Sequence, residues 1–475
     1  MATLSPLLLG SEWRETSTRR SVTSPFTGEA VADVCLAQPE HIEEAMTLSL
    51  CAYPGLARTP AHIRATALHH IADRLKAQQE DFARTICMES GKPIADARRE
   101  VGRAIQTFSI ASEEAKRMQG EIIPMDSSPG MEHHHGLWQR VPIGPVLGIT
   151  PFNFPLNLVA HKVAPCLAAG NPMILKPAPQ TPLTALRLGT IFQELDLPNG
   201  TLSILPCENT LAESMVRDAR IRALSFTGSA AVGWRLKEHA GKKRVVLELG
   251  GNAAVIIEPD ANLDMAAARC LTGGFSYSGQ TCISVQRMYI HDEVYESFLK
   301  RFIPLVEALP TGNPADESTV IGPLISEQAA DRVETLIREA VRQGAQLVTG
   351  GTREQLVIHP TVLAGVRPDM RILCEEAFGP IITLSRYQRL EQALDMVNDS
   401  AYGLQAGIFT HNINSIFHAY HTLDVGAVLA NEIPTFRADH MPYGGVKDSG
   451  LGREGVKYAI QELTEPKLLV LHLPR

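Results

Sequence analysis

A cysteine in a glycine-containing loop is the residue of this chain whose type most directly suggests covalent chemistry. Cys282 ends the run Gly279-Gln280-Thr281-Cys282. Its thiolate could attack a carbonyl carbon and form a thioester intermediate, and Gly279 permits the tight backbone that would present the sulfur to a substrate. Most cysteines are small buried hydrophobic residues, so a role in packing is the alternative.

Three further segments carry polar side chains that would complete such a site. Asn153, in the run ITPFNFP (149–155), could donate its amide to an oxyanion or simply cap a helix. Glu248 precedes two glycines and could act as a general base or end an exposed strand. Glu375 and Glu376 precede a turn, which is usually a solvated corner. Together these segments offer the nucleophile, the oxyanion donor and the base that acyl transfer requires.

The composition indicates a globular protein of more than one domain. The chain has 475 residues, of which 44% are apolar and 20% charged. A net charge of −8 predicts no binding to nucleic acid or to a membrane, and no apolar stretch approaches the length that spans a bilayer. Eight cysteines without CxxC pairs favour reduced thiols over disulfides or a zinc site. Since residues 1–6 show no signal-peptide pattern, we expect a cytoplasmic protein.

The middle of the chain alternates strands with helices. Strands are predicted at 146–149, 172–175, 202–205, 223–226 and 245–249, and helices from after Pro155 to Ala169, from Thr181 to Leu195, at 210–219 and at 230–239. Buried strands joined by such helices form a parallel, doubly wound α/β sheet. Sheets of this kind bind ligands at the carboxyl ends of their strands, and the polar motifs fall at those ends.

The second half repeats this α/β pattern less regularly. Helices are predicted near 293–308, 327–343 and 389–398, and strands at 288–290 and 426–429. A second α/β domain beginning near residue 250 is the simplest division. Residues 119–138 are predicted to leave the first domain as an excursion. Three histidines at 133–135 could bind a metal, but an exposed polar segment is the preferred interpretation, and we expect no metal site.

Six ordered motifs make this sequence similar to the aldehyde dehydrogenase superfamily over essentially its whole length. The motifs are TPFNFP (150–155), FTGSAAVG (226–233), LELGG (247–251), GQTC (279–282), EEAFGP (375–380) and PYGGVKDSGLGREG (442–455). The resemblance implies a Rossmann-like cofactor domain, an α/β catalytic domain and a small β bridging element that forms a homodimer or homotetramer. We assign residues 1–118 and 139–249 to the first, 250–463 to the second, and 119–138 with 464–475 to the third.

The resemblance also implies a role for each catalytic residue. Cys282 would attack the aldehyde, Asn153 would hold the oxyanion with the backbone N–H of Cys282, and Glu248 would activate the water that hydrolyses the thioester. The presence of Glu248 favours release of a free acid over transfer to coenzyme A. By the same matching, the residues that bind NAD or NADP would be Thr150, Pro151, Phe152, Lys176, Pro179, Phe226, Thr227, Gly228, Ser229, Leu249, Gly250, Glu376 and Phe378.

One departure from the family pattern concerns the coenzyme. NAD-preferring relatives carry an acid three residues after the position of Lys176, where it bonds the ribose 2′-OH. This chain has Pro179 there. A 2′-phosphate would therefore meet no like charge at that position, and the resemblance leaves the choice between NAD and NADP open.

Several positions match the walls of the family's substrate pocket, namely Arg99, Arg103, His161, Thr281, Ile283 and Arg437. Guanidinium groups bind carboxylate, phosphate, phosphonate or sulfonate groups with paired hydrogen bonds. The motifs near Cys282 and in the tail are most similar to a branch that acts on short polar aldehydes. We therefore expect NAD(P)-dependent oxidation of a small anionic or hydroxylated aldehyde to its acid.

Two alternatives to this function remain. The enzyme could be a semialdehyde, aromatic or aliphatic aldehyde dehydrogenase of broad specificity, with the arginines facing solvent. A non-enzymatic protein on a dehydrogenase scaffold is disfavoured, because Cys282, Glu248 and Asn153 are all present.

Overall fold

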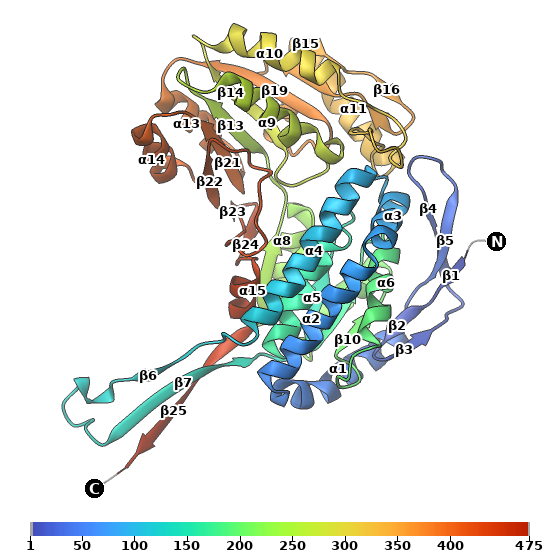
Figure 1. The fold of residues 1–475 in the computed structure, drawn as a ribbon, viewed down its shortest axis with the longest axis vertical. Helices are drawn as coiled ribbons and strands as arrows, with labels where there is room; N and C mark the ends of the chain where they lie inside the picture. Colours follow the sequence, from blue (N-terminus) through green and yellow to red (C-terminus); the bar gives the residue numbers. More distant parts are fainter. Residues whose placement is uncertain (1–2, 474–475) are drawn as a thin grey trace.

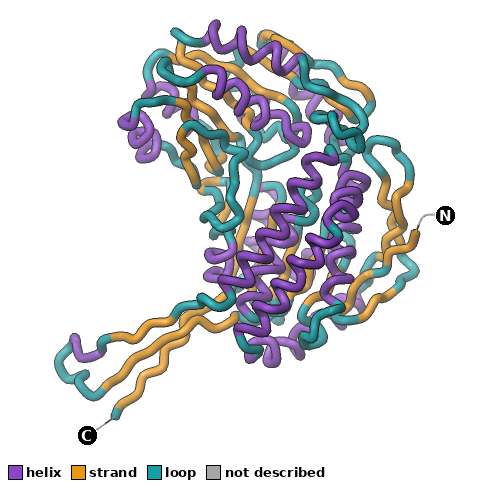
Figure 2. Tube along the Cα trace, in the orientation of Figure 1, coloured by secondary structure: helices purple, strands orange, loops and turns teal. Residues whose placement is uncertain are grey.

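The computed structural model describes residues 3–473, and it consists of two large sheets with their helices and a projecting three-stranded arm (Figures 1 and 2). The predicted α/β class is confirmed. Residues 1–2 and 474–475, the outer ends of two predicted segments, lie outside the described residues. No helix within residues 3–473 is long and apolar enough to cross a membrane.

The first sheet has eight strands in the order β24-β12-β11-β8-β9-β10-β2-β3. Their bounds are β24 (Gly450–Leu451), β12 (Arg244–Glu248), β11 (Ala223–Thr227), β8 (Val146–Ile149), β9 (Met173–Lys176), β10 (Leu202–Ile204), β2 (Leu7–Leu9) and β3 (Glu12–Arg14). The five strands from β12 to β10 are parallel, as predicted. Strand β9 starts one residue later than predicted, because Pro172 has no N–H to give to the ladder.

Helices cover both faces of this sheet (Figure 1). One face is covered by α2 (Ala61–Ala77), α3 (Gln79–Ser90), α4 (Ile94–Glu114), α5 (Asn157–Ala169) and α6 (Leu183–Phe192). The other face is covered by α1 (Pro39–Arg58), α7 (Asn209–Arg217) and α8 (Ala230–Ala240). Helix α6 is shorter than predicted, and Thr181 does not cap it. Its first backbone N–H groups, at Leu183 and Thr184, donate instead to the buried carboxylate of Glu89.

The second sheet has seven strands in the order β15-β18-β19-β14-β13-β21-β22. These are β15 (Gln346–Thr349), β18 (Thr361–Ala364), β19 (Ile381–Tyr387), β14 (Val285–His291), β13 (Ala253–Ile257), β21 (Gln405–Phe409) and β22 (Ala427–Ala430). Its helices are α9 (Leu263–Phe275), α10 (Tyr295–Glu307), α11 (Glu327–Arg342), α12 (Arg371–Cys374), α13 (Leu390–Asn398) and α14 (Ile413–Thr422). The predicted helices and strands of this half occur within a few residues of their expected bounds.

The arm consists of β6 (Gly120–Ile123), β7 (His134–Pro142) and the C-terminal β25 (Thr464–His472), all antiparallel. Strand β7 continues past residue 138, where we expected the excursion to end. Every residue of β25 after Thr464 is exposed, including Leu468 and Leu469. The division into domains stays a prediction. One short piece of the predicted catalytic domain, β24, pairs with β12 and so completes the edge of the first sheet.

Candidate active site

A cavity of about 950 Å³ collects most of the predicted site residues. It lies at the carboxyl ends of β11 and β12, where parallel sheets bind their ligands. The predicted residues that line it are Arg99, Arg103, Pro151, Phe152, Asn153, Thr227, Gly228, Ser229, Glu248, Leu249, Gly250, Thr281, Cys282, Ile283, Glu376, Phe378 and Arg437. Five predicted residues do not line it, namely Thr150, His161, Lys176, Pro179 and Phe226.

A strained loop presents the nucleophile. Tyr277 and Ser278 take positive φ angles of 49° and 54°, which non-glycine residues rarely adopt. The Tyr277 N–H donates to Asp96 at 3.1 Å, and the Ser278 hydroxyl donates to the carbonyl of Gly322 at 2.8 Å. At Gly279, with φ 69°, a Cβ would lie 2.2 Å from a backbone oxygen. Strain compensated by surrounding contacts is typical of a functional site.

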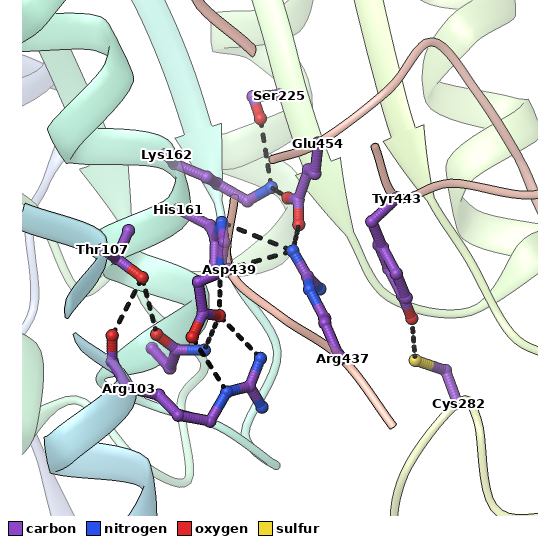
Figure 3. A network of polar contacts seen from close by, with 11 residues as sticks. Arg103, Thr107, His161, Lys162, Ser225, Cys282, Arg437, Asp439, Tyr443 and Glu454 are labelled. Carbon is purple, nitrogen blue, oxygen red and sulfur yellow. Dashed lines mark hydrogen bonds and ion pairs between the residues drawn. The ribbon is translucent and has the colours of Figure 1, made fainter. Parts of the chain in front are cut away.

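The Cys282 sulfur contacts one hydroxyl. Its Sγ lies 3.2 Å from the Oη of Tyr443, the contact drawn in Figure 3. Burial raises the pKa of the Cys282 thiol to about 12, while the hydrogen bond to Tyr443 opposes that rise. The thiol is therefore protonated at neutral pH in this state, and the nucleophile needs a group that favours its thiolate.

Asn153 lies beside the backbone that leads to the nucleophile. Its Nδ2 donates to the carbonyl of Gln280 at 3.0 Å, and its Oδ1 has no partner. Because a primary amide carries two hydrogens, the second hydrogen of Nδ2 is still available to an oxyanion formed at Cys282.

Glu248 ends β12 as a buried carboxyl group. Neither of its oxygens has a hydrogen-bond partner. Burial, and next the charge of Glu454, raise the pKa of Glu248 well above its ordinary value, while Arg437 and Lys162 act in the opposite direction. Both oxygens are free to accept a proton from a water molecule, and the raised pKa makes the ionised group a stronger base.

The opposite part of the cavity fits a dinucleotide. Ser229 is the N-cap residue of α8 and its side chain makes no cap hydrogen bond, so the first N–H groups of the helix are free for a pyrophosphate. Gly250 leaves room that a side chain would fill, since a Cβ there would lie 2.4 Å from Oε2 of Glu376. The rings of Phe152 and Phe378 meet edge to face at 5.8 Å. These contacts form a narrow slot with an acid at its side.

Two predicted coenzyme contacts lie apart from this cavity. The Nζ of Lys176 donates to Oδ1 of Asn209 at 2.9 Å. Pro179 lines a separate small hollow together with Arg20. Burial lowers the pKa of Lys176; among the weaker influences, Arg20 lowers it further and Glu208 raises it. Both charges are therefore close to the lysine.

Each predicted arginine has an acidic partner. Arg437 donates to Glu454 at 3.0 Å, while its guanidinium carbon lies 3.7 Å from the Tyr443 ring centre. Arg103 donates twice to Asp439, at 2.7 and 3.2 Å. Exposed Arg99 pairs with Asp96. The Nε of Arg437 is buried without a partner, so this cation still has a free donor.

His161 does not line the cavity, contrary to our expectation. Its Nε2 contacts Oδ1 of Asp439 at 2.8 Å, and the ring lies against Arg437 (Figure 3). Burial and the charge of Arg437 lower its pKa. The loop that carries Arg437 and Asp439 packs between His161 and the cavity. The histidine therefore contacts the cavity wall from its buried side and helps to hold Arg437 and Asp439 in place.

The sequence analysis did not nominate four polar residues of this network: Lys162, Asp439, Tyr443 and Glu454. Lys162 lies on α5, every residue of which is buried, and its Nζ donates to Ser225 at 3.0 Å and Glu454 at 3.3 Å. A lysine in a mostly apolar helix was the available signal, because a buried charge requires a partner.

Comparison with known proteins agrees with this geometry. Residues 13–469 match the aldehyde dehydrogenase family. A 3-sulfolactaldehyde dehydrogenase of Priestia megaterium is 41% identical over 98% of both chains. The crystal structure of aldehyde dehydrogenase 21 from Physcomitrella patens with its product succinate is 43% identical, with a TM-score of 0.97 over 99% of both chains. An NADP complex of glyceraldehyde-3-phosphate dehydrogenase from Bacillus halodurans is 33% identical, with a TM-score of 0.96 over both whole chains.

Cys282, Asn153 and Glu248, the residues expected to act as nucleophile, oxyanion donor and base, thus line one cavity in a fold whose relatives are dehydrogenases. The chain belongs to the aldehyde dehydrogenase family and is an NAD(P)-dependent aldehyde dehydrogenase.

Proposed function

We propose that this enzyme oxidises a short aldehyde that carries an anionic group, a carboxylate or a sulfonate, at the end remote from the carbonyl. The observation that carries the proposal is that two arginines, Arg103 and Arg437, line the cavity. Guanidinium groups bind carboxylates and sulfonates with paired hydrogen bonds.

In this proposal the chain's own residues perform the acyl chemistry. The Cys282 sulfur attacks the aldehyde carbon, and Asn153 with the backbone N–H of Cys282 stabilises the oxyanion. When bound, the coenzyme supplies the acceptor for the hydride. Glu248 then takes a proton from the water that attacks the thioester, which releases the acid and frees the sulfur.

The relatives support an anionic substrate class. The Priestia enzyme is named for a sulfonated aldehyde, and the Physcomitrella structure holds succinate, a dicarboxylate. These anions differ in chemistry but share a short chain and a terminal charge. A lactaldehyde dehydrogenase of Methanococcus aeolicus is 38% identical to this chain. A neutral, hydroxylated aldehyde is therefore the competing candidate for the substrate.

The alternative is a semialdehyde, aromatic or aliphatic aldehyde dehydrogenase of broad specificity, which would show no preference for an anionic group. The acidic partners of the arginines favour it, because Glu454 and Asp439 already neutralise much of the charge of Arg437 and Arg103. The two functions differ in whether the wall binds one more anion.

Initial rates with matched aldehydes distinguish them. The pairs are 3-sulfolactaldehyde with lactaldehyde, and succinic semialdehyde with butanal, with Cys282→Ala as the blank. We expect kcat/KM to be at least about tenfold higher for the anionic member of each pair, the factor that corresponds to about 1.4 kcal/mol of transition-state binding. Arg103→Gln, which removes a partly exposed cation at the cavity, should reduce the anionic member's advantage. Equal rates within each pair would exclude the anion site.

We also propose that the enzyme accepts both NAD and NADP. Pro179 presents no carboxylate to a 2′-phosphate, and Arg20 and Lys176 are cations nearby. Glu208, paired with Arg20 at 2.6 Å, is an acid that could accept from a ribose 2′-OH. Dissociation constants of 5′-AMP and 2′,5′-ADP, measured by calorimetry, test the proposal. Binding of only one of them would refute dual use.

We further propose that the arm joins copies of the chain into a homodimer or homotetramer. Strand β25 exposes Leu468, Leu469 and Val470 on both faces of a thin sheet, and an apolar strand of this kind is unstable in water without a partner. Sedimentation of the enzyme and of a Leu469→Lys variant tests this. A wild-type monomer would refute it.

A further inference from the structure

The nucleophile of this enzyme has a phenol as its direct neighbour. Tyr443 is 3% exposed, and the only hydrogen-bond partner of its hydroxyl in the described part of the chain is the Cys282 sulfur, 3.2 Å away. A buried hydroxyl requires a partner, and here that partner is the atom that attacks the substrate. The two side chains point toward each other from separate elements (Figure 3).

A cation orients this phenol. The guanidinium carbon of Arg437 lies 3.7 Å from the Tyr443 ring centre, in the range of a strong cation–π contact. Arg437 is itself held by Glu454 at 3.0 Å, and its side chain is 5% exposed. The positive charge over the ring withdraws electron density from the phenol and makes its O–H a better donor. The ion pair therefore fixes the ring in place and strengthens its hydrogen bond.

From this geometry we propose that Tyr443 is a catalytic residue, whose hydroxyl donates a hydrogen bond to the Cys282 sulfur and favours its thiolate. The proposal rests on the proposed function only in taking Cys282 as the nucleophile. Tyr443 keeps its own proton throughout, and the proton that leaves the sulfur passes to water. No other atom is transferred.

The charges around the sulfur show why such a donor matters. Glu376 and Glu248 raise the pKa of the thiol, and Arg437 lowers it. Burial raises the pKa of Tyr443 well above its ordinary value, so the phenol remains a donor over the whole working range of pH. Tyr443 can thus stabilise the thiolate by a direct hydrogen bond while its own hydroxyl stays protonated.

The test is the rate at which Cys282 is alkylated by iodoacetamide as a function of pH, in the full-length enzyme without coenzyme or aldehyde. Mass spectrometry of the Cys282 peptide separates its reaction from that of exposed Cys51 and Cys374. Tyr443→Phe keeps the ring and removes the hydroxyl. We expect its alkylation rate to fall about tenfold at neutral pH, and the rising part of the profile to lie about one pH unit higher, because one hydrogen bond to the charged form is lost.

Tyr402→Phe is the matched control, since it removes a phenol hydroxyl that makes no contact with the sulfur. Its profile should coincide with that of the wild type, and melting temperatures of both variants establish that they are folded. A Tyr443→Phe profile equal to the wild type would overturn the proposal, as would an equal shift in Tyr402→Phe. The readout needs no substrate, so a wrong substrate class would leave this result unaffected.

Discussion

Replacing Glu454 by glutamine should destabilise the enzyme more than a typical loss of one charge. The Glu454 side chain is 2% exposed and accepts from Arg437 and Lys162, which are 5% and 0% exposed. Burial alone would raise the pKa of Glu454, but the two cations outweigh it and hold the pKa below its ordinary value. Glu454→Gln preserves the shape of the side chain and leaves both cations without this counter-charge.

The magnitude follows from the burial of all three groups. Breaking a buried ion pair by removing one partner costs about 3–5 kcal/mol. Glutamine keeps one oxygen that can still accept from these cations, so we expect the lower end of that range, about 3 kcal/mol. Because the folded-state pKa of Glu454 is depressed, its stabilisation is present above the ordinary pKa of a glutamate and is lost as pH falls below it. The cost of the variant should therefore shrink in acid.

Equilibrium unfolding in urea at one protein concentration measures this cost, at neutral pH and at a pH below the ordinary pKa of a glutamate. Glu113→Gln is the control, because Glu113 is 61% exposed and pairs with exposed Arg117. Loss of that surface pair should cost less than about 1 kcal/mol. The reasoning would be refuted if both variants cost the same at neutral pH, or if the cost of Glu454→Gln grew in acid.

Three further predictions concern the loop and the coenzyme slot. Gly279→Ala should lower the melting temperature, because its Cβ would lie 2.2 Å from a backbone oxygen that cannot move freely. Gly250→Ala should weaken NAD binding about tenfold in a fluorescence titration, since the new methyl group would displace the carboxylate of Glu376. Glu208→Gln should increase affinity for 2′,5′-ADP about tenfold relative to 5′-AMP in calorimetry, because it releases Arg20 for the phosphate.

Each of these has a contradicting result. Gly28 has a similar φ of 72° but open space around it, so a Gly28→Ala variant that loses as much stability as Gly279→Ala would remove the argument from close approach. An unchanged NAD dissociation constant in Gly250→Ala would mean that NAD binding does not depend on the position of the Glu376 carboxylate. An equal increase in affinity for 2′,5′-ADP and 5′-AMP in Glu208→Gln would mean that Arg20 does not contact the 2′-phosphate.

The sequence was sufficient to predict the parallel strands, because short buried runs between helices leave few possible topologies. The expectation that Cys282, Asn153 and Glu248 act together came from their residue types and from the resemblance of their motifs to the aldehyde dehydrogenase family, and the three residues do line one cavity. Strand β24 could not be predicted in the same way. It has only two residues, Gly450 and Leu451, and pairs with β12 from far along the chain. So short a segment carries no periodicity, and only tertiary contact makes it a strand.

The error at His161 has a similar cause. His161 lies on α5, every residue of which is buried, and the loop that carries Arg437 and Asp439 contacts its ring. Helical spacing predicts which face a residue shares, while the partner of that face depends on packing. The sequence analysis nominated Arg437 but missed Asp439, and it linked neither residue to α5, because both lie far from that helix in the sequence.

The segment from Arg437 to Glu454 also determines when this protein can become active during its synthesis. It supplies the cation over Tyr443, the counter-charges of Lys162 and Arg103, and the last strand of the first sheet. A ribosome releases these residues after every strand of the second sheet and every strand of the first sheet except β24. A nascent chain that has not reached Tyr443 therefore holds Cys282 without its hydroxyl neighbour, and the surroundings of the thiol are completed only once this segment has emerged.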